Sequence, residues 1–219
     1  MMPRQFTARQ QQQILDWEAA KRWRVLPAGE IFPAVVRYQP PSVLTGGTLS
    51  LTASRIGIAR QASCRAATDA AVAAVLARND CQAVLRATYV DGTDSYVVTV
   101  GVAAFPGTAQ AAAAEEELGG TTLTGAGGSA AGVQAVEFKH TPAGLFSDLG
   151  RQISLHQRAA TYVIFSAIGY ADGRPVVRVT SDPYVDAEMT SLGAGVADAV
   201  QSVLAAPLPR PHCPGTAGC

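Results

Sequence analysis

Charged side chains are scarce in this chain. They make up 16% of its 219 residues, whereas they make up about 25% of a typical soluble domain. Only Lys21 and Lys139 are lysines, and the 17 basic residues are balanced by 17 acidic ones. This even balance gives no electrostatic reason to bind nucleic acid or an acidic substrate, so we expect no nucleic-acid partner.

Long hydrophobic runs are also missing. No stretch approaches the ~20 apolar residues that a membrane-spanning helix requires, and the most apolar segment, residues 162–171, has the length of a strand. The first residues, MMPRQFTARQQQQ, lack the apolar core of a secretory signal peptide. Taken literally, these absences indicate a cytoplasmic protein, whereas the cysteines indicate the opposite.

Familiar catalytic and cofactor motifs are absent too. The chain contains no GxSxG, Walker or HExxH motif. Residues 119–132 include Gly125, Gly127 and Ala130 at the spacing of a dinucleotide-binding loop, but an expected helix precedes them and an expected strand follows. Because that motif requires the reverse order, we interpret the segment as a flexible surface loop. We therefore expect no catalytic residue and no cofactor, and we predict that the chain is not an enzyme.

Metal binding has little support in the sequence. His212, Cys213 and Cys219 could supply ligands, but zinc sites normally present two closely spaced ligand pairs, and the tail holds only one. Pairing a cysteine with His140 or His156 as a nucleophile would need a catalytic signature that the cysteine regions lack. We expect no metal site.

The clearest structural signal is residues 81–118, which predict a strand, a tight turn, a second strand and a helix. Residues 83–90 and 96–104 are rich in the β-branched and aromatic residues that favour strands. Asp91-Gly92 supplies the turn chemistry, and Pro106-Gly107 ends the second strand before an alanine-rich helix.

A second hairpin is predicted from residues 161–170 and 176–180, because Asp172-Gly173 repeats the Tyr-x-Asp-Gly turn. Further predicted elements are strands at residues 34–38, 48–58 and 133–139, helices at residues 68–78 and 185–206, and a connection over residues 140–157 that is partly helical from Leu145. The expected fold class is α+β, an antiparallel sheet of two β-hairpins plus additional strands, with the helices packed on one face. We expect a set of valines to be buried together: Val72, Val75, Val97, Val163 and Val200.

The chain divides into an N-terminal helical region (1–26), a single α+β domain (27–206) and a Pro/Gly-rich tail (207–219) whose composition is typical of disorder. Residues 7–25 predict a helix that Thr7 can cap. This helix carries a cluster of aromatic and basic residues: Trp17, Lys21, Arg22, Trp23 and Arg24. One interpretation is peripheral contact with a membrane or a partner, and the other is a helix that packs both tryptophans on its own domain.

Cys64 and Cys81 flank the helix predicted at residues 68–78. We predict a disulfide between them, with Cα atoms about 4.4–6.8 Å apart, and such a bridge would indicate an oxidising compartment. The alternative is two free thiols in a cytoplasmic protein. Cys213 and Cys219 make a second potential pair, which the sequence leaves open.

Residues 62–114, ASCRAATDAAVAAVLARNDCQAVLRATYVDGTDSYVVTVGVAAFPGTAQAAAA, resemble a class of uncharacterised actinobacterial proteins that are exported or anchored by one transmembrane helix. The order of elements over residues 17–206 is distantly similar to the extracellular sensor domains of actinobacterial Ser/Thr kinases and to related lipoproteins. The resemblance rests on element order, Cys64 and Cys81, and carries no catalytic residue across. Members usually have a hydrophobic N-terminal segment, so three alternatives stay open: a removed anchor, a start assigned downstream of it, or a soluble protein.

We predict a non-enzymatic, extracytoplasmic or membrane-anchored domain that binds or senses an unknown protein or small-molecule ligand through its sheet or the cleft beside it. The alternative is an intracellular structural or assembly protein that docks on a partner through its N-terminal helix. The sequence specifies neither the ligand nor the oligomeric state.

Overall fold

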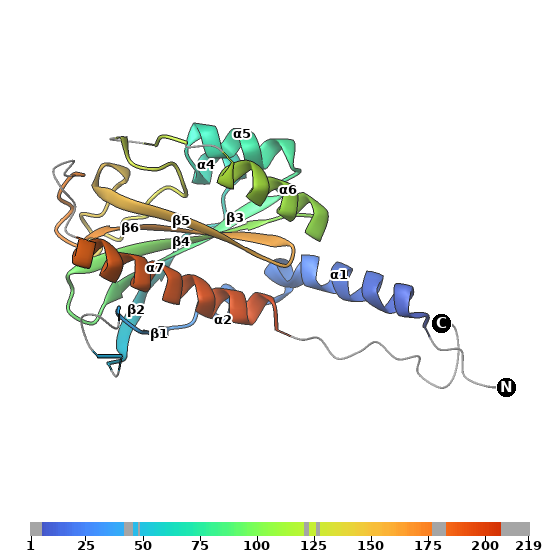
Figure 1. The fold of residues 1–219 in the computed structure, drawn as a ribbon, viewed down its shortest axis with the longest axis horizontal. Helices are drawn as coiled ribbons and strands as arrows, with labels where there is room; N and C mark the ends of the chain where they lie inside the picture. Colours follow the sequence, from blue (N-terminus) through green and yellow to red (C-terminus); the bar gives the residue numbers. More distant parts are fainter. Residues whose placement is uncertain are drawn as a thin grey trace.

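The computed structural model describes residues 6–41, 46–47, 49–120, 123–125, 128–176 and 183–206. Within them the chain forms a six-stranded sheet in the order β1-β2-β3-β4-β6-β5, and every neighbouring pair is antiparallel (Figure 1). The strands are β1 (Val35–Tyr38), β2 (Leu51–Ile58), β3 (Ala83–Asp91), β4 (Tyr96–Ala104), β5 (Arg151–Ala159) and β6 (Tyr162–Tyr170). This architecture confirms the predicted α+β class.

Helices cover both faces of the sheet (Figure 1). The helices are α1 (Ala8–Val25), α2 (Ala28–Ile31), α4 (Cys64–Ala67), α5 (Ala70–Arg78), α6 (Thr108–Gly119) and α7 (Pro183–Leu204), with a 3-10 turn at Asp148–Gly150. α7 packs on one face together with α1 and α2, whereas α4, α5 and α6 pack on the other. The prediction that all the helices share one face is therefore wrong.

The central strands explain why both faces are covered. Every residue of β4 after Tyr96 is buried, and so is every residue of β6 before Tyr170. Because side chains alternate between the two sides of a strand, such strands need a packed layer on each side. The five valines expected to be buried together are all buried, but they divide among three clusters. Val200, on α7, belongs to the cluster on the α7 face, Val72 and Val75 of α5 pack with Val163 of β6 on the other face, and Val97 lies in a smaller cluster.

The hairpin of β3 and β4 matches the prediction, with Val90 opposite Val97 next to the turn. Asp91 is 3% exposed, and its carboxylate accepts hydrogen bonds from the backbone N–H groups of Thr93 (2.9 Å) and Ser95 (2.8 Å). Asp91 thus satisfies the backbone of the turn, which is the role expected of aspartate there.

The second hairpin differs from the prediction. The predicted connection over residues 140–157 contains a strand, because residues 151–157 form most of β5, and β6 pairs with β5 on one side and with β4 on the other. The Gly173 turn is present, with φ of 71° and a hydrogen bond from the Gly173 N–H to the Tyr170 carbonyl at 3.1 Å. Because both sides of β6 are occupied, a strand after Gly173 has no place beside it, and residues 177–180 lie outside the described part.

Residues 133–139 do not form the predicted strand; they run across the face of the sheet that α5 and α6 cover. The Thr88 hydroxyl donates to the Val136 carbonyl (2.8 Å), and the Val136 N–H donates to the Thr99 hydroxyl (3.0 Å). Gly101 permits this close approach, because a Cβ there would lie 2.6 Å from the Val133 side chain. Hydrogen bonds to threonine side chains therefore replace strand pairing.

Arg151 is fully buried at the start of β5 and anchors part of the glycine-rich segment. Its guanidinium donates to the carboxylates of Asp69 (2.6 Å) and Asp148 (3.3 Å). Asp69 also accepts the Gly132 N–H at 2.9 Å. The prediction of a flexible surface loop over residues 119–132 is therefore wrong at its C-terminal end, where the loop is tied to the sheet.

α7 contacts both edge strands, β1 and β5, as well as β4 and β6, so the curled sheet wraps around this helix. Two glycines allow the close contact. A Cβ at Gly193 would lie 2.6 Å from the Ile168 side chain, and one at Gly195 would lie 2.4 Å from the Tyr38 side chain. The packing leaves a hollow between α7 and β1.

Candidate functional site

Helix α1 is docked on the domain through its C-terminal half. The Tyr162 hydroxyl donates to the Ala19 carbonyl (2.6 Å) and accepts the backbone N–H of Trp23 (3.3 Å). The Trp23 side chain is 7% exposed. The Arg22 guanidinium donates to the Leu204 carbonyl (2.8 Å) at the C-terminal end of α7, where helix carbonyls lack partners of their own. Arg22 and Trp23 therefore hold the helix on the domain.

The N-terminal half of α1 projects from the domain (Figure 1). Thr7 caps its start, as the sequence predicts, and does so in a capping box with Gln10. Trp17 is 55% exposed, and Lys21 Nζ lies 3.0 Å from the centre of the indole ring. We name residues 6–21 the arm. A shallow hollow on the arm is lined by Phe6, Gln10, Gln13, Ile14 and Trp17.

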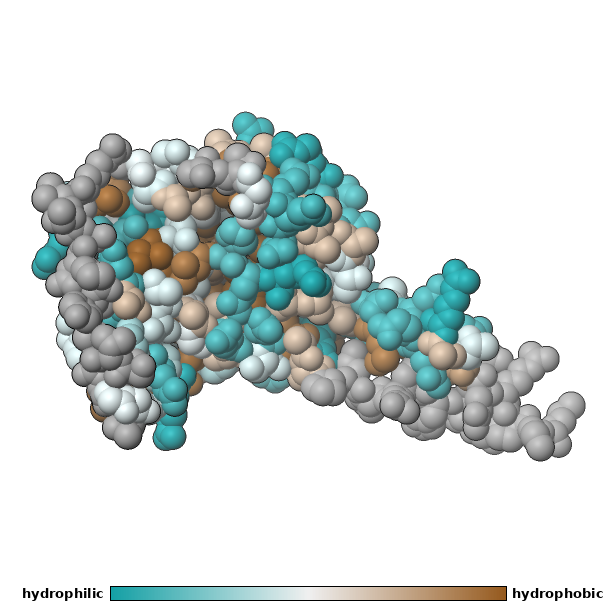
Figure 2. Space-filling model, viewed as in Figure 1, coloured by the Kyte–Doolittle hydropathy of each residue, from teal (hydrophilic) through white to brown (hydrophobic). Residues whose placement is uncertain are grey.

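Figure 2 shows hydrophilic and hydrophobic residues mixed along the arm, without a continuous hydrophobic face on the side in view. Among the described residues, no helix combines the length and the apolar character needed to cross a bilayer. The exposed Trp17 and the half-buried Lys21 combine an aromatic ring with a cation, a combination typical of contact with a polar interface.

The five residues predicted to contact a membrane or a partner do not form one surface. Arg22 and Trp23 face the domain, whereas Trp17 and Lys21 lie on the arm. Arg24 is exposed, its guanidinium lies 4.6 Å from the Trp23 ring, and it donates to the Gln82 amide at 3.1 Å. The Trp23 indole nitrogen, expected to find a partner if packed, has none among the described residues. Trp23 is thus packed on the domain and Trp17 is not, so the interpretation that both tryptophans pack holds for Trp23 alone, and contact with a membrane or a partner stays a prediction.

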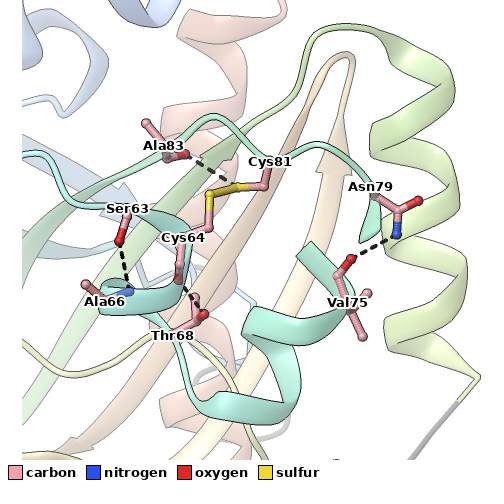
Figure 3. Close-up of a disulfide and its surroundings, with 8 residues drawn as sticks. All are labelled: Ser63, Cys64, Ala66, Thr68, Val75, Asn79, Cys81 and Ala83. Atoms are coloured by element: carbon pink, nitrogen blue, oxygen red, sulfur yellow. Dashed lines mark hydrogen bonds between the residues drawn. A yellow bond between two sulfur atoms is a disulfide. The ribbon is translucent and has the colours of Figure 1, made fainter. Parts of the chain in front are cut away.

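Cys64 and Cys81 form a disulfide, with their Cα atoms 6.3 Å apart (Figure 3). This distance lies within the predicted range of about 4.4–6.8 Å. The bond joins the start of α4 to the segment that enters β3, and encloses α5. The Ser63 hydroxyl accepts the Ala66 N–H at 3.3 Å, which caps α4 beside the bridge. Cys213 and Cys219 lie outside the described residues.

A larger hollow lies between the edge strand β1 and α7, and we name it the β1–α7 groove. Its volume is about 580 Å³. From the β1 side it is lined by Arg37, Tyr38 and Gln39, and from α7 by Ser191, Ala194, Gly195, Asp198, Ala199 and Ser202. The α7 residues recur at intervals of three and four, which places them along one side of the helix. Their short side chains leave the space beside β1 open.

Polar groups at this groove retain hydrogen-bonding capacity. One carboxylate oxygen of Asp198 accepts from the Gln157 amide at 2.9 Å, and the other has no partner in the described part of the chain. The exposed Arg37 guanidinium likewise makes no hydrogen bond or ion pair there. Burial, followed by the charges of Asp91 and Glu188, raises the pKa of Tyr38 well above its usual range, so this phenol stays neutral. The groove thus offers one anion and one cation to a ligand, together with the hydroxyl oxygens of Ser191 and Ser202, whose protons are donated to α7 carbonyls.

The other residues considered for chemistry do not converge. The described residues contain no group of three or more His, Cys, Asp or Glu side chains that could hold a metal ion. His156 lies against Phe165, with 6.2 Å between ring centres, and His140 occupies a turn with φ of 62°. His212, named with Cys213 and Cys219 as a potential metal ligand, lies outside the described residues.

The β1–α7 groove was not predicted from the sequence. The spacing of short residues from Ser191 to Ser202 was the available signal. Short residues on one side of a helix predict close packing as readily as an open surface, and only the position of β1 distinguishes the two.

No family model matches the chain, and no match to it was found among curated proteins or solved structures. Its function is therefore argued from its own residues.

Proposed function

We propose that this chain is a non-enzymatic, extracytoplasmic binding domain that takes its ligand in the β1–α7 groove. The observation that carries the proposal is the groove itself. Its volume of about 580 Å³ falls within the ~300–1,000 Å³ typical of ligand sites. The unpaired oxygen of Asp198 and the unpaired guanidinium of Arg37 supply polar contacts at its rim.

The disulfide supports the extracytoplasmic part of the proposal. Bonds such as Cys64–Cys81 persist in oxidising compartments and are rare in the cytoplasm of most organisms. The resemblance of residues 62–114 to exported actinobacterial proteins points in the same direction.

Filling the groove should abolish ligand binding while the domain stays folded. Ala194→Leu places a bulky side chain at a half-buried position of the groove. We expect a peptide, oligosaccharide or metabolite panel to yield a ligand that stabilises the wild type by about 2.7 kcal/mol at 100 times its Kd. The same ligand should leave the melting temperature of Ala194→Leu unchanged in thermal-shift measurements.

Ala113→Leu is the matched control, because Ala113 is exposed on α6, on the other side of the sheet. This variant should respond to the ligand like the wild type. The proposal fails if none of the three ligand classes stabilises the wild type, or if Ala194→Leu responds as strongly.

The arm supports a second function, contact with an anionic membrane surface. Trp17 is exposed, and three basic residues of α1, Arg9, Lys21 and Arg24, are not engaged by α7. Asp16 and Glu18 offset two of these charges, so we expect weak, salt-dependent binding. The docked C-terminal half of α1 would hold the domain beside the bilayer.

Trp17→Ala combined with Lys21→Ala should reduce sedimentation with vesicles of phosphatidylcholine and phosphatidylglycerol. Losing one lysine near an anionic surface costs about 1 kcal/mol, so we expect the bound fraction to fall at least severalfold. Lys139→Ala, which changes the only lysine outside the arm, should bind like the wild type. Equal binding by the double variant and the wild type, or no binding by either, would remove the membrane function.

A further inference from the structure

The outer edge of β1 carries backbone groups that point away from the sheet. The Arg55 N–H of β2 donates to the Ala34 carbonyl at 2.9 Å. The β1–β2 register, in which Val35 lies opposite Ser54, places these two residues opposite each other when it is continued by one residue. Backbone groups alternate in direction along an antiparallel pair. Ala34 and Val36 therefore bond to β2, whereas the N–H and C=O groups of Val35 and Arg37 point to the outer edge.

These outward groups have no hydrogen-bond partner within the part of the chain that the structure describes. An unpaired strand edge is a template for another extended backbone. Pro33 and Pro40 bracket the open part of this edge, because proline has no N–H to offer. About five residues of an added strand, roughly 16 Å long, would cover it.

The β1–α7 groove lies beside this edge and provides the room that a strand needs. Val36 and Tyr38 are buried toward α7, whereas Val35 and Arg37 are exposed. On the helix the groove is lined by short side chains such as Ala194. An extended backbone placed there could hydrogen-bond to β1 and pack every second side chain against α7, as in recognition by strand addition.

We propose that the β1–α7 groove binds an extended peptide segment of a partner protein, which pairs with the outer edge of β1. This inference rests on the proposed binding function and names its ligand class. Peptide N–H and C=O groups recur at the spacing of the outward groups of Val35 and Arg37. A peptide can therefore hydrogen-bond to these outward backbone groups and fill the groove at the same time.

Charge makes a second copy of this chain a poorer occupant. Pairing β1 with the β1 of another copy would bring two Arg37 side chains into one short edge, and β1 has no acidic residue to compensate. It would also bring together the two copies of Asp198, which lines the same groove. Like charges in neighbouring positions destabilise paired strands.

The groove predicts which peptides bind. Side chains directed toward α7 must be short, because α7 closes that side of the groove. On the opposite side, the unpaired Arg37 favours an acidic residue at the facing position. We expect bound peptides to alternate short residues with residues that include at least one Asp or Glu.

Peptides selected from a random phage-displayed library on the full chain supply the probes, and fluorescence anisotropy measures their Kd. Arg37→Pro removes an outward N–H that takes no part in pairing with β2, a substitution that edge strands tolerate. We expect it to raise the Kd about tenfold more than Arg37→Ala, which keeps the N–H and loses the charge. Circular dichroism checks that both variants stay folded.

Methylation of single peptide N–H groups tests strand addition from the ligand's side. Binding should be lost at every second position, because alternate N–H groups face β1. The inference is overturned if no peptide is selected, if Arg37→Pro and Arg37→Ala bind alike, or if the methylation pattern lacks a period of two. If an oligosaccharide or a metabolite binds instead of a peptide, and Ala194→Leu abolishes that binding while Arg37→Pro does not, strand addition is overturned and the groove remains the binding site.

Discussion

Replacement of Arg151 by alanine should lower the free energy of unfolding by about 3–5 kcal/mol. The guanidinium is fully buried and lies 2.6 Å from the Asp69 carboxylate, whose side chain is only 13% exposed. Removing the cation leaves this carboxylate without its counter-charge in a poorly hydrated site, which is the costly way to break a buried pair. It also releases the anchor of the segment around Gly132. Urea denaturation followed by circular dichroism gives the free energy.

A surface ion pair provides the matched control. Arg174 and Asp172 are joined at 2.6 Å but are 53% and 52% exposed, so Arg174→Ala should barely move the urea midpoint.

Arg151→Met should lower the free energy of unfolding as much as Arg151→Ala does. Adding Asp69→Ala to Arg151→Met should restore part of the lost stability, because the unpaired carboxylate is then gone. A midpoint for Arg151→Ala equal to that of the wild type would contradict this account of the buried pair.

Local patterns predicted the hairpin of β3 and β4, α1, and α5 with its flanking cysteines. In each, neighbouring residues determine the structure: Asp91 builds its own turn, and Thr7 and Gln10 cap their own helix. The placement of helices on both faces was predictable in principle. The residues of β4 and β6 read as nearly continuous apolar runs, a pattern typical of strands buried on both sides.

Features that depend on distant residues could not be predicted in the same way. β5 contains Gln152, His156 and Arg158 and lacks a strong strand pattern, and it forms because β6 offers it an edge. Arg151 looks like one more arginine in an arginine-rich chain, and only the folded arrangement brings Asp69 beside it. The groove likewise depends on β1 and α7, two elements that lie far apart in the sequence and meet only in the folded domain.

Replacement of both Cys64 and Cys81 by alanine should lower the free energy of unfolding by about 3 kcal/mol, because the bridge closes a loop with a sequence separation of 17. In the loop-entropy account the bond acts on the unfolded chain, which it keeps compact. Its loss should therefore also raise the denaturant m-value, since the freed chain exposes more surface on unfolding. Urea titrations of both proteins in a Cys213→Ser, Cys219→Ser background isolate this bond from the tail cysteines.

Reducing agent is the control. It should lower the urea midpoint of the protein that keeps Cys64 and Cys81 to the midpoint of the alanine variant. The midpoint of the alanine variant should not change. Equal stability with and without the bond would contradict the loop-entropy account.

The redox state of Cys64 and Cys81 in the cell also reports on the compartment. In protein alkylated rapidly during lysis of its native host, Cys64 and Cys81 should resist labelling until they are reduced, because an extracytoplasmic chain keeps this disulfide. Full labelling before reduction would place the chain in a reducing compartment and remove the extracytoplasmic part of the proposed function.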